Sequence, residues 1–351
     1  MKATMKTTIT TSQAPELLKD VLRAGLVPMM HSSPGIGKSS IAKDLAKAHN
    51  LKVIDLRLSQ CDPTDLSGFP SIDRENNIAS YVPMDTFPTE NTPFPKKDDG
   101  TSYSGWLLLL DEINSAPLMV QASAYKLVLD RQVGQFDLHK DVAMMAAGNL
   151  ITDKAIVNKL STAMASRMVH FELEVSHKEW LIWAADNDID TRLTSYIAYK
   201  PDSLHSFNSN MDDKTFSCPR TLEFASRIIK DWPTIPNSKR PVLVGTLGTG
   251  VANEFMTFCK IFDKLPKIED ILNDPKGFKY DENEPSVNFA LSGIIAANVN
   301  DKTLGSLMDV LNRMPKEFQV LTMQDMMRRR IELRERSEIQ KWVTENTEEL
   351  C

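Results

Sequence analysis

The sequence predicts an α/β domain with a parallel sheet, followed by an all-helical half. Up to about residue 175, short apolar runs bounded by polar residues alternate with segments of helical periodicity, as in a βαβ arrangement. From residue 176 onward the apolar residues follow helical spacing alone. The 351 residues, of which 42% are hydrophobic, can form more than one core, so the chain is long enough for two domains.

A glycine-rich loop connects the first apolar strand to a helix. The strand covers Leu26–Met30, and the helical pattern begins near Ile41. Backbone N–H groups of such a loop bind phosphate oxygens, and the helix N-terminus adds the positive end of its dipole. Lys38 is expected to reach the β- and γ-phosphates of a nucleotide, and the Ser39 hydroxyl to bind Mg²⁺. The candidate phosphate-binding residues are Ser33, Pro34, Gly35, Ile36, Gly37, Lys38, Ser39 and Ser40.

One position departs from the phosphate-loop pattern G-x-x-x-x-G-K-[ST]. Ser32 stands where the pattern has its first glycine, whereas Gly37, Lys38 and Ser39 match it. We therefore retain the prediction of a nucleotide-binding loop. The departure keeps open a second hypothesis, in which Ser32 distorts the turn and the protein is a nucleotide-dependent assembly switch that hydrolyses slowly.

Two acidic residues end a second apolar strand. Trp106–Leu110 is a continuous apolar run, which is typical of a strand buried on both faces of a parallel sheet, and Asp111 and Glu112 follow it. Ligands of open α/β sheets bind beyond the carboxyl ends of the strands. Asp111 is therefore expected to bind Mg²⁺, and Glu112 to orient and polarise an attacking water.

Periodicity and turn residues predict the remaining elements. Further strands are expected at 52–58, 142–149 and 169–173, and hairpins near 70–83 and 132–141. Helices are expected at 16–23, 117–130, 177–187, 190–199, 219–232, 241–262, 287–298, 302–313 and 323–347. Because parallel strands end at one edge of their sheet, the glycine loop, the two acidic residues and Asn149 should meet there.

Composition and charge argue against several classes of function. The net charge of −6 provides no overall basic surface for non-specific nucleic-acid binding. The cysteines lie far apart and without histidines at ligand spacing, so we expect free thiols and no zinc site; they are Cys61, Cys218, Cys259 and Cys351. The first residues lack the apolar core of a signal peptide, and no apolar stretch is long enough to cross a bilayer. We therefore expect a cytoplasmic protein without membrane insertion.

Two further patterns are interpreted as structural. Gly245–Gly250 is glycine-rich but lacks lysine and lies in an apolar, helix-like run, which indicates close helix packing rather than a second phosphate loop. Arg328–Arg330 is basic, but the segment continues with oppositely charged residues at i,i+4 spacing, which indicates a solvated helix face. These pairs are Arg328 with Glu332, Glu332 with Arg336, and Arg334 with Glu338.

Five separated elements occur in an order typical of one family. They are Gly35–Ser39, Leu108–Asn114, Ala146–Asn149, Ala163–Met168 and Ser217–Arg220. Together they resemble an AAA+ ATPase of the MoxR-like branch, over about residues 12–262. The resemblance implies an AAA+ P-loop NTPase core with a parallel sheet at residues 1–175 and a hairpin insert near 69–87. It also implies a helical lid at 176–262, which leaves a helical C-terminal extension at 263–351.

The resemblance also implies a role for each matching residue of the core. Lys38 and Ser39 would serve the phosphates of ATP and Mg²⁺, and Asp111 would bind Mg²⁺. Glu112 would be the catalytic base. Asn149 would be sensor 1, which positions the attacking water and contacts the γ-phosphate.

Two arginines complete the implied catalytic set. Arg167 would be the arginine finger, acting on the nucleotide of a neighbouring subunit, with Arg131 as the alternative residue for this contact. Arg220 would be sensor 2, at the start of a lid helix. An arginine supplied in this way contributes about 10³–10⁵ to the rate in related phosphate-loop enzymes.

A finger that acts between subunits implies an oligomer, and head-to-tail contacts repeated around an axis close into a ring. The family resemblance implies a homo-oligomeric, hexameric ring that remodels or activates a protein partner, for which a von Willebrand factor A domain protein is the family's precedent. The alternatives are a nucleic-acid-linked motor, as in the related McrB-type enzymes, and the slow switch described above. The acidic net charge favours a protein partner over nucleic acid.

Overall fold

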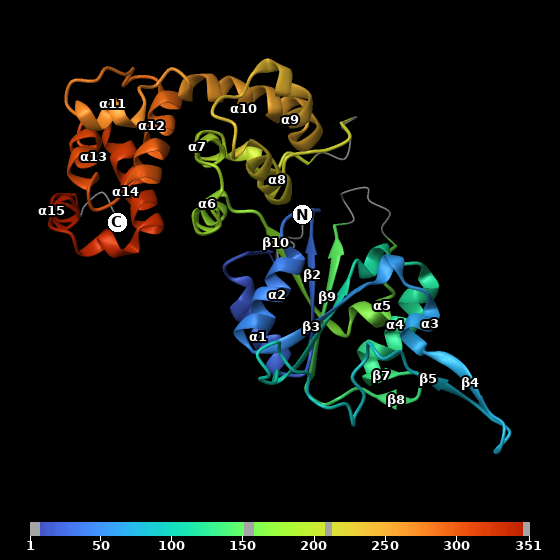
Figure 1. Ribbon diagram of the computed structural model, residues 1–351. Helices are drawn as coiled ribbons and strands as arrows, with labels where there is room; N and C mark the ends of the chain where they lie inside the picture. Colours follow the sequence, from blue (N-terminus) through green and yellow to red (C-terminus); the bar gives the residue numbers. More distant parts are fainter. Residues whose placement is uncertain (1–7, 151–157, 208–212, 347–351) are drawn as a thin grey trace, which may run out of the picture. The chain divides into compact units, whose positions relative to one another are not determined.

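The computed structural model describes residues 8–150, 158–207 and 213–346 of the chain. These residues divide into two compact units, one up to Val175 and the other from Ser176 onward (Figure 1). The first unit mixes strands and helices, and the described part of the second contains helices and no strand. The fold is therefore α/β in the first unit and all-helical in the second, as the hydrophobic pattern predicts.

The first unit is built on a six-stranded parallel sheet. In spatial order its strands are β1 (Thr8–Thr10), β10 (Met168–Glu174), β2 (Val27–Ser32), β9 (Val142–Asn149), β6 (Gly105–Asp111) and β3 (Leu51–Arg57). Every neighbouring pair is parallel, so all six strands end at the same side, called here the carboxyl edge of the sheet. The parallel sheet is confirmed; the short β1, which pairs with β10, was not expected from the sequence.

Both faces of the sheet are covered by helices. Leu107 and Leu109 of β6 belong to the core formed with α1 (Ala14–Arg23) and α2 (Lys38–Ala48). Leu108 and Leu110 point to the opposite core, which α3 (Pro63–Ser67) and α4 (Leu118–Asp130) close (Figure 1). All four leucines are fully buried, which explains why β6 is continuously apolar instead of alternating with polar residues.

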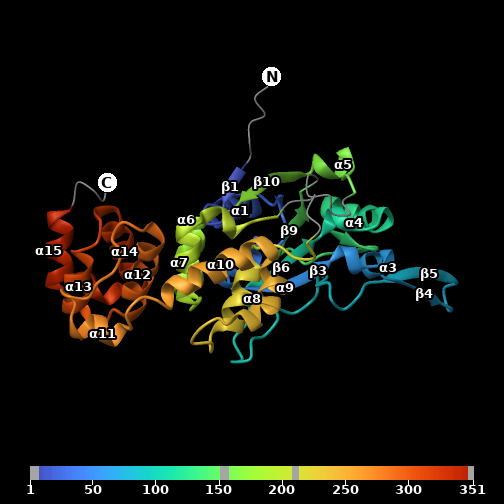
Figure 2. The same cartoon turned by 90° about the horizontal axis from the view of Figure 1, so that it is seen from above.

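Two hairpins interrupt the α/β pattern of the first unit. β4 (Phe69–Asp73) and β5 (Ile78–Val82) form an antiparallel ribbon that extends away from the sheet (Figure 2). Its exposed side chains include large apolar residues: Phe69, Ile72, Ile78, Tyr81 and Val82. The second hairpin, β7 (Gln132–Val133) and β8 (Phe136–Asp137), lies between α4 and β9. Both hairpins occur where turn residues predict them.

The helices of the second unit are α6 (His177–Asp186), α7 (Thr191–Tyr199), α8 (Pro219–Ile229), α9 (Arg240–Leu247), α10 (Thr249–Phe262), α11 (Ile268–Asn273), α12 (Pro285–Asn298), α13 (Leu304–Leu311), α14 (Lys316–Arg329) and α15 (Ser337–Glu345). The last five helices share a core that includes Leu291, Leu307 and Trp342. In this unit α7 packs against α12, and α12 also packs against α14 (Figure 1). Residues 263–346 therefore contact the preceding helices of this unit through α12.

The single helix expected at 241–262 is wrong. The chain forms two helices, α9 and α10, that are separated at Gly248. Gly248 has φ +82°, a left-handed conformation that interrupts a helix and favours glycine. A Cβ at Gly245 or Gly250 would meet no atom within 4 Å, so these two glycines do not mediate the close helix packing expected of them.

The long helix expected at 323–347 is also wrong. α14 ends at Arg329, a 3₁₀ segment covers Ile331–Glu335, and α15 begins at Ser337. The break lets Leu333, Ile339 and Trp342 all enter the same core, which a straight helix with this spacing would not allow. The i,i+4 ion pairs predicted across residues 328–338 therefore have no continuous helix on which to form.

Cys61, Cys218 and Cys259 are free thiols, as expected. Cys351 and the first residues of the chain lie outside the described ranges. Within those ranges, no helix combines the length and apolar character needed to traverse a bilayer.

Candidate functional site

The glycine loop lies at the carboxyl edge of the sheet, between β2 and α2. Gly35 has φ +81° and Gly37 has φ +110°, values that glycine adopts without steric cost. Gly37 is the N-cap of α2, and the helix begins at Lys38. The first N–H groups of α2 have no partner within the helix, so they and the dipole face this edge. Ile36 is buried in the core beside α1 and α2 and anchors the loop.

Lys38 reaches two neighbouring strand ends. Its Nζ donates to the Ser32 carbonyl and the Ser32 Oγ, each at 3.0 Å, and to the Asn149 Oδ1 at 3.2 Å. Ser32 ends β2 and Asn149 ends β9, and the two residues are directly paired in the sheet. The loop lysine and the polar residue predicted to join it are therefore in contact.

Ser32 is accommodated without distortion. It is the last residue of β2, its side chain is fully buried, and its Oγ donates to the Ser33 carbonyl at 3.0 Å. Only five residues other than glycine have positive φ in the described part of the chain, and Ser32 is not one of them. This position therefore does not need glycine for its backbone conformation, and the hydroxyl adds an acceptor for Lys38.

Ser39 and Asp111 place two side-chain oxygen atoms next to each other. The Ser39 Oγ donates to the Asp111 Oδ2 at 2.9 Å, although the residues lie on α2 and at the end of β6. Asp111 is only 8% exposed. A hydroxyl and a carboxylate side by side are the hard oxygen donors that Mg²⁺ prefers, so these residues fit the ion expected here. Within the described ranges, no three His, Cys, Asp or Glu side chains cluster as metal ligands.

Glu112 follows Asp111 in a left-handed conformation, with φ 56° and ψ 31°. Such a backbone is uncommon outside glycine and is typically maintained by surrounding contacts. One such contact is Ser59, whose Oγ donates to the Glu112 Oε2. Ser59 lies in the 3₁₀ turn Leu58–Gln60 directly after β3, the strand that pairs with β6. Ser59 was not among the residues predicted from the sequence, although a polar residue just beyond a predicted strand is a signal that could have identified it.

Asn114 is a second residue that the sequence did not single out. Its Nδ2 donates to the Asn149 carbonyl at 2.7 Å, and its Oδ1 accepts from the Asn149 N–H at 3.0 Å. It is 3% exposed. A Cβ on Gly148 would clash with the Asn114 Oδ1, so this close approach requires glycine at 148. The pair fixes the end of β9 and with it the side chain of Asn149.

Arg167 and Arg131 have different environments. Arg167 is exposed just after α5 (Thr162–Ala165); its Nη1 donates to the Ala163 carbonyl at 2.7 Å, and its guanidinium lies over the Tyr125 ring. Arg131 is partly buried after α4, and its Nη2 donates to the Val142 carbonyl at 2.5 Å. Burial lowers the pKa of Arg131. The Arg131 side chain is thus bound to a backbone carbonyl inside the first unit, whereas the Arg167 side chain lies on the surface of that unit.

Two histidines lie beside the loop. The His31 Nε2 is 2.9 Å from the His170 Nδ1, the rings are stacked, and the His170 Nε2 contacts the Ala165 carbonyl at 2.8 Å. Burial lowers the pKa of His31 to about 4, with smaller contributions from His170 and the positive charge of Lys38. His31 is therefore neutral at pH 7. Because a carbonyl oxygen can only accept, the His170 Nε2 donates to Ala165.

Arg220 belongs to the second unit. It is exposed in the first turn of α8, whose N-terminus is fixed by Thr221: the Cys218 N–H donates to the Thr221 Oγ1 at 2.8 Å. The structure thus joins Lys38, Ser39, Asp111, Glu112 and Asn149 at the carboxyl edge. It presents Arg167 elsewhere on the first unit and Arg220 on a helix of the second.

Comparison with known proteins gives structural likeness only. No protein-family profile matches the chain, and no curated protein matches it. Among solved structures, a Cytophaga hutchinsonii protein provisionally classed as an ATPase is 15% identical, with a TM-score of 0.34 over 90% of this chain and 79% of that one. The Thermotoga maritima RuvB Holliday junction branch migration motor is 16% identical, with a TM-score of 0.38 over 84% of this chain and 85% of that one.

Proposed function

We propose that this protein is a Mg²⁺-dependent ATPase of the MoxR-like AAA+ type that assembles into a ring and remodels a protein partner. The observation that carries the proposal is the joining of Lys38, Ser39, Asp111, Glu112 and Asn149 at one edge of a parallel sheet. These residues come from three segments of the chain. Their chemistry, one cation beside two carboxylates and a row of helix N–H groups, suits a nucleoside triphosphate and water.

The proposed roles follow from the contacts. Lys38 exchanges its serine and asparagine acceptors for phosphate oxygens, and the N–H groups of the loop bind the same phosphates. Ser39 and Asp111 hold Mg²⁺, which when bound neutralises charge on the phosphates. Glu112 accepts the proton of the attacking water, and its bond from Ser59 fixes the direction of its carboxylate. Asn149, oriented by Asn114, contacts the γ-phosphate.

The ring proposal rests on the environment of Arg167. A guanidinium on the surface, aligned by a backbone carbonyl and an aromatic ring, is available to another subunit, whereas Arg131 is not. We therefore propose Arg167 as the residue that completes a neighbouring subunit's site, and a hexamer as the closed form. The partner would be a protein, with a von Willebrand factor A domain protein as the first candidate.

The decisive experiment measures mass by light scattering with and without ATP and Mg²⁺, in a Glu112→Gln variant that blocks turnover. We expect a nucleotide-dependent shift from smaller species to a hexamer. A monomer under every condition would contradict the ring, because Arg167 would then have no neighbouring site.

Mixing two defective variants tests the contact between subunits. Arg167→Ala supplies an intact Glu112, and Glu112→Gln supplies an intact Arg167. Only interfaces that combine the two intact halves should hydrolyse ATP, so the mixture should be more active than either variant alone. Equal inactivity in the mixture and in the separate variants would reject the assignment of Arg167.

The nature of the partner is tested by stimulation of turnover. We expect a protein partner to change the ATPase rate, and DNA or RNA to leave it unchanged at low salt. Stimulation by nucleic acid with a steep salt dependence would instead support the hypothesis of a nucleic-acid-linked motor.

A further inference from the structure

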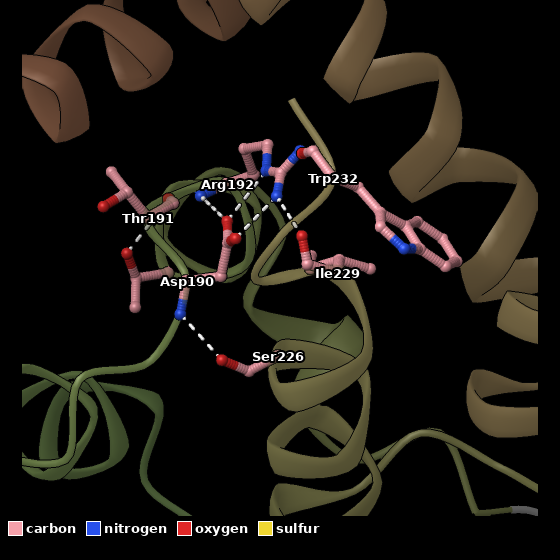
Figure 3. Close-up of polar contacts among 7 residues, drawn as sticks. Asp190, Thr191, Arg192, Ser226, Ile229 and Trp232 are labelled. Atoms are coloured by element: carbon pink, nitrogen blue, oxygen red, sulfur yellow. Dashed lines mark hydrogen bonds and ion pairs between the residues drawn. The ribbon is translucent and has the colours of Figure 1, made fainter. Parts of the chain in front are cut away.

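A largely buried ion pair at the start of α7, between Asp190 and Arg192, contacts the end of α8 in the second unit (Figure 3). The Arg192 Nε and Nη2 donate to the two carboxylate oxygens of Asp190, at 2.9 and 2.6 Å. The side chains are 14% and 12% exposed, and Asp190 also accepts from the Arg192 N–H at 2.9 Å. Burial disfavours the charge of Arg192, but the bond to Asp190 and the negative charge of that carboxylate raise the pKa of Arg192 above its ordinary value.

Arg192 also binds the backbone where α8 ends. Its Nη1 donates to the Trp232 carbonyl at 2.7 Å, and its Nη2 donates to the Ile229 carbonyl at 2.8 Å (Figure 3). The Asp190 N–H donates to the Ser226 Oγ on the last turn of the same helix, at 2.9 Å. A cation at the carbonyl end of a helix is favoured by the helix dipole. The Ile229 carbonyl, which also accepts from the Trp232 N–H, gains a second bond from Arg192. The C-terminal end of α8 is therefore fixed to α7 by three bonds.

The other end of α8 carries Arg220. Thr221 fixes that end through Cys218 and through its bond to the Phe216 carbonyl at 2.9 Å. These bonds run within the first turn of α8 and the residues just before it, so Arg220 keeps its place on the helix when the helix moves as a rigid body. The direction of Arg220 thus depends on where α7 holds the far end of its helix.

The C-terminal extension contacts α7 at the same turn. Gly293 of α12 lies so close that a Cβ there would clash with the Ser195 Oγ and would lie 2.9 Å from the Thr191 Cγ2. Thr191 and Ser195 lie on α7, and Thr191 is flanked by the two members of the ion pair. Any shift of α12 against α7 therefore displaces the first turn of α7, which is the turn that binds the end of α8.

We propose that Asp190 and Arg192 are positioning residues for Arg220, and that the contact of α12 with α7 at Gly293 makes residues 263–346 part of the same positioning device. The proposal rests on the ATPase function proposed above and on the sensor 2 role that the family resemblance implies for Arg220. It gives the C-terminal extension a regulatory role, because a ligand or partner that shifts α12 would change nucleotide turnover through α7 and α8.

The proposal is tested by a double-mutant cycle between Arg192 and Arg220 in the full-length chain. Turnover (kcat and KM) and the Kd for a fluorescent ATP analogue are measured for Arg192→Met, Arg192→Lys, Arg220→Ala and the doubles. We expect Arg192→Met to change the same parameter as Arg220→Ala, by at least about fivefold, and to add nothing in the Arg220→Ala background. Arg192→Lys, which keeps the charge but not the planar fork, should lie in between.

Matched controls separate positioning from general destabilisation. Arg227→Met removes an arginine of α8 that is exposed and paired with Glu223, and it should leave kcat, KM and Kd unchanged. Gly293→Ala should change the same parameter as Arg192→Met. Gly305→Ala, in α13 of the same extension, places its Cβ where no atom lies within 4 Å and should change none of them. Thermal unfolding of every variant identifies those that lose the fold, and Asp190→Asn carries the comparison if Arg192→Met does not fold.

The proposal would be overturned if Arg192→Met changed kcat, KM or Kd by the same factor in the wild-type and Arg220→Ala backgrounds. It would also be overturned if Arg220→Ala left turnover unaltered. An effect of Gly305→Ala as large as that of Gly293→Ala would overturn the role of the extension. Failure of the proposed function has a different signature: the wild-type chain and Lys38→Ala would then be indistinguishable in analogue binding. A wild-type chain that binds and hydrolyses ATP while the cycle shows no coupling rejects the positioning role alone.

Discussion

The two units use their polar side chains in different ways. In the first unit, polar side chains from segments far apart in the sequence meet at the carboxyl edge of the sheet. In the second unit, the largely buried side chains of Asp190 and Arg192 connect two neighbouring helices, α7 and α8. Lys38, Asp111 and Asn149 keep partners that a ligand can replace. Arg192 uses four of its five guanidinium N–H groups to bind a carboxylate and two carbonyls. The difference separates groups arranged to exchange partners from groups arranged to hold a position.

The largest effect is expected at Lys38, because the contrast between the two units depends on Lys38 being a ligand-binding group. Lys38→Ala should abolish binding of a fluorescent ATP analogue, because phosphate charge at the loop would lose its cation. Lys43→Ala, on an exposed position of the same helix, should bind normally and serves as the control. Undiminished binding by Lys38→Ala would remove the phosphate loop from the proposed function.

The two arginines of the first unit refine this contrast. Arg167→Ala should lower turnover of the assembled protein by at least about tenfold with little change in analogue binding, because its guanidinium acts on another subunit. Arg131→Ala should instead lower the free energy of unfolding by about 1–3 kcal/mol, because the buried Val142 carbonyl loses its donor. Turnover, analogue binding and chemical denaturation are measured for both variants. If Arg131→Ala lost turnover and Arg167→Ala lost stability instead, Arg131 would be the arginine finger.

A smaller effect is expected at Asn114. Asn114→Ala should lower kcat by about tenfold, because Asn149 loses the two bonds that orient it, while analogue binding changes less. Ser115→Ala, in the 3₁₀ turn Ile113–Ser115 that also holds Asn114, is the matched control, because the backbone N–H of Ser115, not its side chain, donates to the Glu112 carbonyl. If kcat were equal in the two variants, the paired asparagines would be a purely structural feature.

The remaining effect concerns pH. The pKa of His31 is about 4 in the folded chain and about 6.5 when unfolded, so the unfolded chain binds more protons between these values. The stabilisation from keeping His31 neutral is complete above pH 6.5 and is lost as the pH falls toward 4. The difference in unfolding free energy between wild type and His31→Gln should therefore shrink over this window, with the exposed His49→Gln as control. A constant difference from pH 7 to pH 4 would contradict the lowered pKa.

Sequence periodicity predicts most elements because each depends on nearby residues. The phosphate loop, the buried β6 and the hairpins at 69–82 and 132–137 are examples. The errors occur where distant packing decides: Gly248 interrupts one helix, and Arg330 interrupts another so that Leu333 and Trp342 share a core. At Gly248 the glycine itself is a local stop signal that apolar periodicity does not register. At Arg330 no residue type marks the break, because both halves have helical spacing.

Local sequence was sufficient to predict the α/β class, the loop that contains Lys38 and Ser39, and the acidic end of β6, because these follow from backbone preferences and the alternation of apolar residues. Tertiary packing was needed to establish that Ser59 bonds to Glu112, that Asn114 orients Asn149, and that α12 rests on α7. These contacts join residues far apart along the chain. Their pairing is set by strand order and helix packing, which no short sequence pattern encodes.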